Sequence, residues 1–287
     1  MRWRAGRESD NVEDRRGSSI SRGAKIGGLG GLGLVAVVVI GMFLGIDPSA
    51  LLQGISETQD TSITTQQNGS PGVNDEMRKF VAVVLGDTED VWSETFRKMG
   101  RTYEEPKLVL FSQAVESACG MAGSATGPFY CPADHKVYLD LSFFEDMRTR
   151  FGASGDFAQA YVIAHEVGHH VQTLMGIADK VRSLQSRSAS SERNKLSVMM
   201  ELQADCFAGV WANKAHESRQ ILESGDIEEG LNAASAIGDD RIQKRTQGRV
   251  VPDAFTHGSS AQRVGWFKRG LESGNHQACD TFNVSRL

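Results

Sequence analysis

The 287-residue sequence predicts an α+β protein, mostly helical with a small antiparallel sheet, which follows one N-terminal transmembrane helix. Three observations predict this class. A 21-residue stretch near the N-terminus has no charge, two short runs in the middle are typical of β-strands, and most of the C-terminal half has helical periodicity. The net charge of −5 argues against a nucleic-acid partner, because phosphate binding needs a clustered basic excess.

The N-terminal region predicts a membrane anchor. Residues 1–25 hold seven basic and four acidic side chains, and residues 26–46 hold none and reach about 30 Å as a helix, the thickness of the hydrocarbon layer. Basic residues before a span favour a cytoplasmic N-terminus, so we expect a single-pass inner-membrane protein with a periplasmic or otherwise extracytoplasmic body. A cleaved signal peptide and a buried core helix are the alternatives, and the long basic segment without a small-residue cleavage site favours a retained anchor.

The remaining chain divides into a linker and a globular domain. Residues 47–73 are rich in Thr, Gln, Ser and Gly and are expected to form a flexible linker, because they cannot bury enough apolar surface. Residues 74–287 are expected to fold as one domain. Strands are predicted over 107–111 and 137–144, the second running into a helix, and further helices are predicted at 77–85, 91–99, 157–175, 192–217, 227–237 and 261–271.

The most specific chemical signal is a pair of histidines in an apolar helical pattern. His165 and His169 are four residues apart, so a helix places both imidazoles on one face, where they can bind a zinc ion. Glu166 would lie beside the metal without binding it, as a general base requires. Two surface histidines are the alternative, which the surrounding apolar residues disfavour. Gly168 lacks a side chain and predicts close packing by another element.

A zinc ion used in catalysis needs a third protein ligand, and Glu201 in a second apolar helix is the predicted one. Asp205 follows one turn later and is predicted to accept a hydrogen bond from a liganding histidine, which fixes the histidine tautomer. A solvated acidic face is the alternative for these two carboxylates. His216 and His257 stay open as other third ligands.

With these residues in place, HEVGHH followed by ELQAD resembles a gluzincin arrangement, in which HExxH is joined by a downstream Glu-x-x-x-Asp helix. The stretches CGMAGSATGPFYCPADHKVYLD and FTHGSSAQR resemble, more narrowly, the bacterial neutral zinc metallopeptidase family of membrane-anchored proteins (the YpfJ type). The resemblance covers almost the whole chain. It implies a zincin-like fold, with the sheet bordering the active-site cleft, and one Zn²⁺ per chain.

The cleft itself has three weaker candidates. In zincin-like folds an edge strand pairs with an extended peptide substrate, and the resemblance implies this role for residues 136–141. Tyr130 is a candidate for lining the cleft, with a place in the core or an interface as the alternative. His257 is a candidate catalytic residue that would stabilise an oxyanion, although a lone loop histidine is often structural.

The four cysteines are enough for two disulfides. Cys119 and Cys131 bracket a glycine-rich loop, which suits a local bridge, and Cys206 and Cys279 would then pair with each other. Three connectivities remain open on sequence grounds, and free thiols are the expectation for a body that faces the cytosol.

Together these features predict a membrane-anchored zinc metallopeptidase, a gluzincin-like metalloendopeptidase, that hydrolyses a peptide or protein substrate. Glu166 would take a proton from a zinc-activated water and return it to the leaving amine. The alternatives are a non-catalytic, zinc-stabilised binding or scaffold module of the cell envelope and an enzyme that hydrolyses a non-protein amide. The glutamate adjacent to a ligand favours the enzyme, because a structural zinc site needs a fourth ligand instead.

Overall fold

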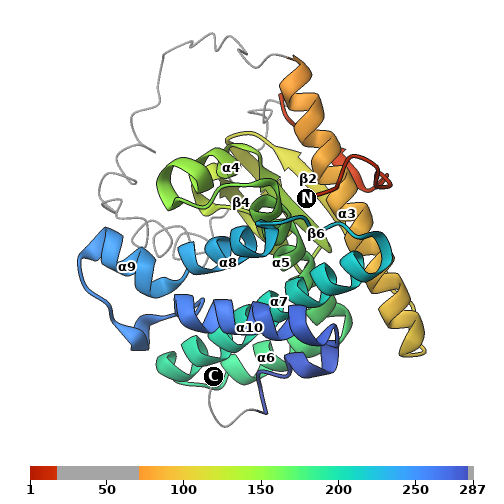
Figure 1. Ribbon diagram of the computed structural model, residues 1–287. Helices are drawn as coiled ribbons and strands as arrows, with labels where there is room; N and C mark the ends of the chain where they lie inside the picture. The colour runs from red at the N-terminus through yellow and green to blue at the C-terminus, as the bar shows by residue number, and fades with distance from the viewer. Residues whose placement is uncertain (18–70, 284–287) are drawn as a thin grey trace, which may run out of the picture.

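The computed structural model describes residues 1–17 and 71–283, which form one compact body (Figure 1). The predicted membrane span at 26–46 and the predicted linker up to residue 70 lie outside the described residues. Within the two described ranges, no helix combines the length and the apolar character that crossing a bilayer requires.

Segments from the first half of the chain form a mixed four-stranded sheet, in the strand order β1-β2-β6-β5. β1 (Val12–Asp14), β2 (Lys107–Phe111) and β6 (Lys136–Asp140) are parallel, and only β5 (Phe129–Cys131) is antiparallel to its neighbour. The prediction of an antiparallel sheet is therefore wrong. In this sheet only β5 and β6 are joined by a tight turn. Long stretches of chain separate β1 from β2 and β2 from β6, and these allow parallel pairing.

Helices make up most of the described chain, which confirms the α+β class. Several predicted helices are present with small shifts at their ends, and the two predicted before residue 100 are one continuous helix. The helices are α3 (Pro71–Lys98), α4 (Ser142–Asp146), α5 (Asp156–Leu174), α6 (Ile177–Gln185), α7 (Ser190–Arg219), α8 (Asp226–Ala236), α9 (Asp239–Gln247) and α10 (Ser260–Ser273). A small hairpin, β3 (Ala114–Ser117) with β4 (Gly120–Gly123), completes the regular structure.

The helix α5 occupies the centre of the domain. It contacts β5 and β6 on one side and α3, α7 and α8 on others, and α10 packs along α7 (Figure 1). Fourteen of its nineteen residues are buried, so its apolar residues face neighbours almost all round. Large buried side chains, among them Trp92, Phe157, Trp211 and Phe267, fill the space between these helices. The helix that holds both predicted histidine ligands is thus fixed from several directions.

The N-terminal residues belong to this body. Residues 1–17 lie along α3, and β1 extends the sheet beside β2 (Figure 1). Met1 and Trp3 are buried, and the Trp3 ring meets the Phe80 ring edge to face at 5.3 Å. The sequence predicts residues 1–25 as a segment apart from the domain. The contacts of residues 1–17 join them to it instead.

Candidate metal centre

Two imidazoles from α5 and one carboxylate from α7 meet at the centre of the domain. Nε2 of His165 lies 3.2 Å from Oε2 of Glu201, and Nε2 of His169 lies 3.5 Å from its Oε1. One ligand atom from each of the three residues can be chosen so that all lie within 4.8 Å of one another. A tetrahedral zinc ion about 2.0–2.2 Å from each ligand atom holds the ligand atoms roughly 3.3 Å apart, so the donor set and its spacing fit zinc.

A close helix crossing brings these ligands together. A Cβ atom added to Gly168 would lie 3.0 Å from the carbonyl oxygen of Ala204 and 3.1 Å from its Cα. The backbones of α5 and α7 therefore approach more closely here than a larger residue allows. Gly168 lies between the two histidines, and Ala204 lies between Glu201 and Asp205. The close packing predicted for Gly168 is confirmed.

Asp205 lies behind His165 in a fully buried network. Nδ1 of His165 lies 2.8 Å from Oδ1 of Asp205, and Arg263 of α10 donates from Nε and Nη2 to the two oxygens of the same carboxylate at 2.8 and 2.9 Å. The Tyr161 hydroxyl also donates to Asp205. Because an ionised carboxylate only accepts, His165 donates from Nδ1 and keeps the Nε2 lone pair for a metal. Asp205 thus accepts a hydrogen bond from one of the two candidate ligand histidines, as the sequence predicted.

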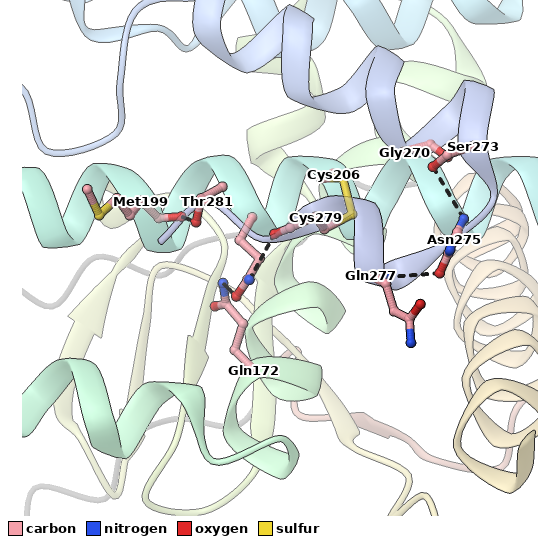
Figure 2. Close-up of a disulfide and its surroundings, with 10 residues drawn as sticks. Gln172, Met199, Cys206, Gly270, Ser273, Asn275, Gln277, Cys279 and Thr281 are labelled. Carbon is pink, nitrogen blue, oxygen red and sulfur yellow. Dashed lines mark hydrogen bonds between the residues drawn. A yellow bond between two sulfur atoms is a disulfide. The ribbon is translucent and has the colours of Figure 1, made fainter. Parts of the chain in front are cut away.

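His169 is oriented by a different chain of contacts. Its Nδ1 lies 2.9 Å from Oε1 of Gln172, whose amide nitrogen donates to the carbonyl of Met200 and to Gln203. Gln203 in turn donates to the carbonyl of Cys279 in the C-terminal tail. Figure 2 shows Gln172 below the tail, next to the disulfide between Cys279 and α7. Because the amide nitrogen of Gln172 donates elsewhere, its oxygen accepts from His169, which leaves Nε2 of His169 free to bind a metal.

The charges of the cluster shift the titration of its members. Burial lowers the pKa of His165, but the charge and hydrogen bond of Asp205 outweigh this and raise it to about 10. Burial raises the pKa of Glu201, but the neighbouring histidines hold it well below its usual range. Without a metal, a proton on His165 balances the ionised carboxylates. A metal ion therefore competes with that proton for the site.

The cluster opens into a cavity of about 580 Å³, which Glu166 also lines. In the described part of the chain, the Glu166 carboxylate forms no hydrogen bond or ion pair, although its residue is only 8% exposed. Its place next to His165 leaves it free to exchange a proton with a molecule in the cavity.

His257 lines the same cavity and is half-exposed. Asp239, buried at the start of α9, accepts backbone N–H bonds from Thr256, His257 and Gly258 and lies 3.2 Å from Nδ1 of His257. Burial lowers the pKa of His257, while Asp239 raises it and leaves it above its usual value. The loop is therefore fixed, and His257 is outside the three-residue ligand cluster. His216 is the other residue that the sequence left as a possible third ligand. Its Nδ1 accepts a hydrogen bond from the backbone N–H of Leu222 instead.

Tyr130 lines the cavity from β5, as one of the two interpretations predicted. Nε2 of His170 lies 2.6 Å from the Glu104 carbonyl, which can only accept, so Nδ1 of His170 accepts from the Tyr130 hydroxyl at 3.0 Å. Burial lowers the pKa of His170 to about 4, which keeps it neutral in this role.

The implied edge strand at 136–141 is wrong, because β6 is paired on both sides. The edge strand that lines the cavity is β5, and β1 forms the opposite edge of the sheet.

Both predicted disulfides are present, Cys119–Cys131 and Cys206–Cys279.

Sequence reasoning missed three residues that orient the cluster, Tyr161, Gln172 and Arg263. Helical spacing offered a signal for the first two, because Tyr161 is one turn before His165 and Gln172 is three residues after His169. Arg263 is almost sixty residues beyond Asp205, and no local pattern identifies it as a partner.

Comparisons with known proteins identify the family to which this chain is similar. The family described as "Putative neutral zinc metallopeptidase" matches residues 1–282. The uncharacterized protein YpfJ of Escherichia coli (strain K12) is 54% identical over 295 aligned positions, which cover 99% of this chain and all of that protein. An uncharacterized protein of Mycobacterium tuberculosis (strain ATCC 25618 / H37Rv) is 39% identical over 86% of each chain. No solved structure matches this chain.

Proposed function

The chain belongs to the neutral zinc metallopeptidase family, and on this premise we propose that it is a zinc-dependent peptidase with Glu166 as general base. His165, His169 and Glu201 would hold one zinc ion. When bound, zinc lowers the pKa of a water molecule to about 7 and polarises a substrate carbonyl. The observation that carries the proposal is the unpaired Glu166 carboxylate, which faces the cavity next to three residues with zinc-binding spacing.

The residues around the cavity can share the work of peptide hydrolysis. Glu166 takes a proton from the attacking water and delivers it to the leaving amine. His257 can donate from Nε2 to the oxygen that gains charge, because Asp239 holds the other side of the ring. The tautomers fixed by Asp205 and Gln172 keep both ligand nitrogens available.

The edge of the sheet offers a place for the substrate backbone. β5 is paired with β6 on one side only, and Phe129 and Tyr130 line the cavity. An extended peptide could add to the free edge by main-chain hydrogen bonds, which would lay its scissile carbonyl across the site. The disulfide at Cys131 and the bond from Tyr130 to His170 hold this strand in place. This arrangement supports a peptide or protein substrate.

The Glu166→Gln variant tests the proposal, with Glu192→Gln, an exposed position on α7, as the matched control. We expect both purified proteins to bind one zinc ion per chain, because Glu166 is outside the ligand cluster. Only Glu166→Gln should lose cleavage of a peptide library, by at least 10²-fold, the usual contribution of a general base. Metal analysis and mass spectrometry of the digest measure the two quantities.

The alternatives give different results in the same experiment. Cleavage by Glu166→Gln at the parental rate would refute the mechanism. A parent protein that binds zinc, loses stability with a chelator and cleaves no peptide would be a zinc-stabilised binding module or an enzyme for another amide. The binding module is disfavoured by the ligand count, since the described residues bring three ligands together and a structural zinc site needs four.

A further inference from the structure

The N-terminal segment, residues 1–17, provides the partners of a buried carboxylate on α3. The Glu89 side chain is 1% exposed, and its hydrogen bonds come from Arg7, Ser9 and Asn11. A Cβ added to Gly86 would lie 2.6 Å from the carbonyl oxygen of Arg7, so the two backbones are in close contact. Removing this segment would leave the buried Glu89 carboxylate without these partners, which is costly for a charged group.

The N-terminal ammonium is held by acidic residues at the start of the metal-binding helix. It donates to Asp156, the first residue of α5, at 2.7 Å and to Asp226 of α8 at 3.3 Å. Asp156, Asp226 and Glu229 have oxygens within 4.8 Å of one another, so the ammonium supplies the charge that reduces their repulsion. Burial lowers the pKa of this ammonium, and the hydrogen bonds and charges of Asp156 and Asp226 raise it above its usual value overall.

Further contacts fix the far end of the segment beside the beginning of α3. Asp14 lies 4.0 Å from Nε of Arg78, and Glu8 lies 3.8 Å from Nζ of Lys79. β1 also pairs with β2 over its full length. The N-terminal segment and the first turns of α3 therefore lie side by side.

From these contacts we propose that the N-terminal segment and the domain 71–283 lie on the same side of any membrane that the protein contacts. Groups 4 Å apart cannot be separated by a hydrocarbon layer about 30 Å thick. The proposal is incompatible with a single crossing by residues 26–46, with the N-terminus inside and the body outside, which the sequence predicts.

The single crossing was predicted from the basic residues of the N-terminal segment. Several of these residues form ion pairs within the protein itself. Arg4 pairs with Glu76, Arg7 with Glu89 and Asp90, and Arg15 with Glu13. The basic residues are thus partly neutralised by carboxylates of the protein itself.

Cysteine labelling on both parts of the full-length chain tests the proposal. Ala5→Cys and Lys268→Cys place thiols at exposed positions on the N-terminal segment and on α10, and the native cysteines are all in disulfides. A membrane-impermeant maleimide is applied to intact spheroplasts and again after permeabilisation. We expect the two variants to react under the same condition. Reaction of one in intact spheroplasts and of the other only after permeabilisation would overturn the proposal.

A cross-link then tests the docking itself. Glu8→Cys with Lys79→Cys should be joined within one chain by a short bis-maleimide, because the parental side chains are 3.8 Å apart. Glu8→Cys with Lys244→Cys is the control, since α9 and α3 lie on opposite sides of the molecule (Figure 1). Two free, reactive thiols in the Glu8–Lys79 variant that fail to cross-link would show that the segment is undocked. Neither experiment depends on zinc or on peptidase activity.

Discussion

At the scale of single residues, the candidate site depends on which nitrogen of each histidine carries the proton. Asp205 and Gln172 each accept a hydrogen bond from the Nδ1 atom of one histidine, so both Nε2 atoms are available to a metal. Asp205 can do this only because Arg263 compensates its charge in a fully buried position. Sequence spacing predicted the ligands and Asp205, but it could not predict a cation that folding brings from α10.

We therefore expect Arg263→Lys to weaken zinc binding about 10–100-fold, the usual effect of disturbing a group that orients a ligand. Lysine keeps the positive charge, but it cannot donate to both oxygens of Asp205 in the fork geometry of arginine. Competition with a chelating dye measures the affinity. Arg269→Lys is the matched control, because Arg269 is exposed on the same helix and its cation lies over Trp266. Parental zinc affinity in Arg263→Lys would show that Arg263 does not act on the site.

At the scale of elements, the crossing of α5 and α7 determines whether the three ligands meet. Sequence periodicity predicted both helices within a few residues of their ends and indicated a close neighbour at Gly168. It missed β1, which is three residues long, charged at two of them and stabilised by pairing with β2 rather than by local propensity. The family resemblance implied the wrong edge strand, because strand order depends on contacts between distant segments, which short-range patterns do not report.

The Gly168→Ala variant tests this crossing. Its new methyl group would press against the Ala204 backbone at about 3.0 Å, so the helices must separate by a few tenths of an ångström. We expect weaker zinc binding because the histidines move away from Glu201, even though alanine favours the helix itself by roughly 1 kcal/mol. Gly265→Ala on α10 is the control, since nothing lies within 4 Å of its new Cβ. It should keep parental zinc affinity, and equal affinities in the two variants would disprove the role of the crossing.

At the scale of the whole molecule, both ends of the described chain are bound to the elements that carry the site. The N-terminal ammonium contacts the first residue of α5, and the C-terminal tail is joined to α7 by Cys206–Cys279 (Figure 2). Thr281 also donates to the carbonyl of Met199 on α7. Neither association follows from local sequence patterns, although the cysteine count allowed the second. Closing the fold at both ends restrains the two helices that must meet.

The two disulfides should contribute unequally to stability. Cys206–Cys279 spans 73 residues and Cys119–Cys131 spans 12, and a longer loop loses more entropy when it is closed in the unfolded chain. We expect the Cys206→Ala/Cys279→Ala variant to lose roughly 3–5 kcal/mol of unfolding free energy and the Cys119→Ala/Cys131→Ala variant roughly 2–3 kcal/mol. Urea unfolding under non-reducing conditions measures both. A larger loss in the second variant would contradict this order.

The attachment of β1 predicts a pH dependence of stability. Nζ of Lys136 lies 3.0 and 3.2 Å from the two carboxylate oxygens of Glu13. Burial raises the pKa of Glu13, but the bonds from Lys136 and Arg15 outweigh this and lower it to about 2. A pKa below the unfolded value of 4.5 stabilises the fold above about pH 4.5, and this contribution is lost as pH falls towards 2.

We expect Glu13→Gln to lower the unfolding free energy at pH 7 by about 0.5–1 kcal/mol, a modest value because the pair is partly exposed. The difference from the parent should shrink steadily as pH falls from 4.5 to 3, since the parental carboxylate then gains its proton in the unfolded chain. Urea titrations at several pH values measure this difference. Glu116→Gln, at an exposed position on β3, should show none at any pH. A Glu13→Gln difference independent of pH would mean that the charge of Glu13 does not help hold β1 to the sheet.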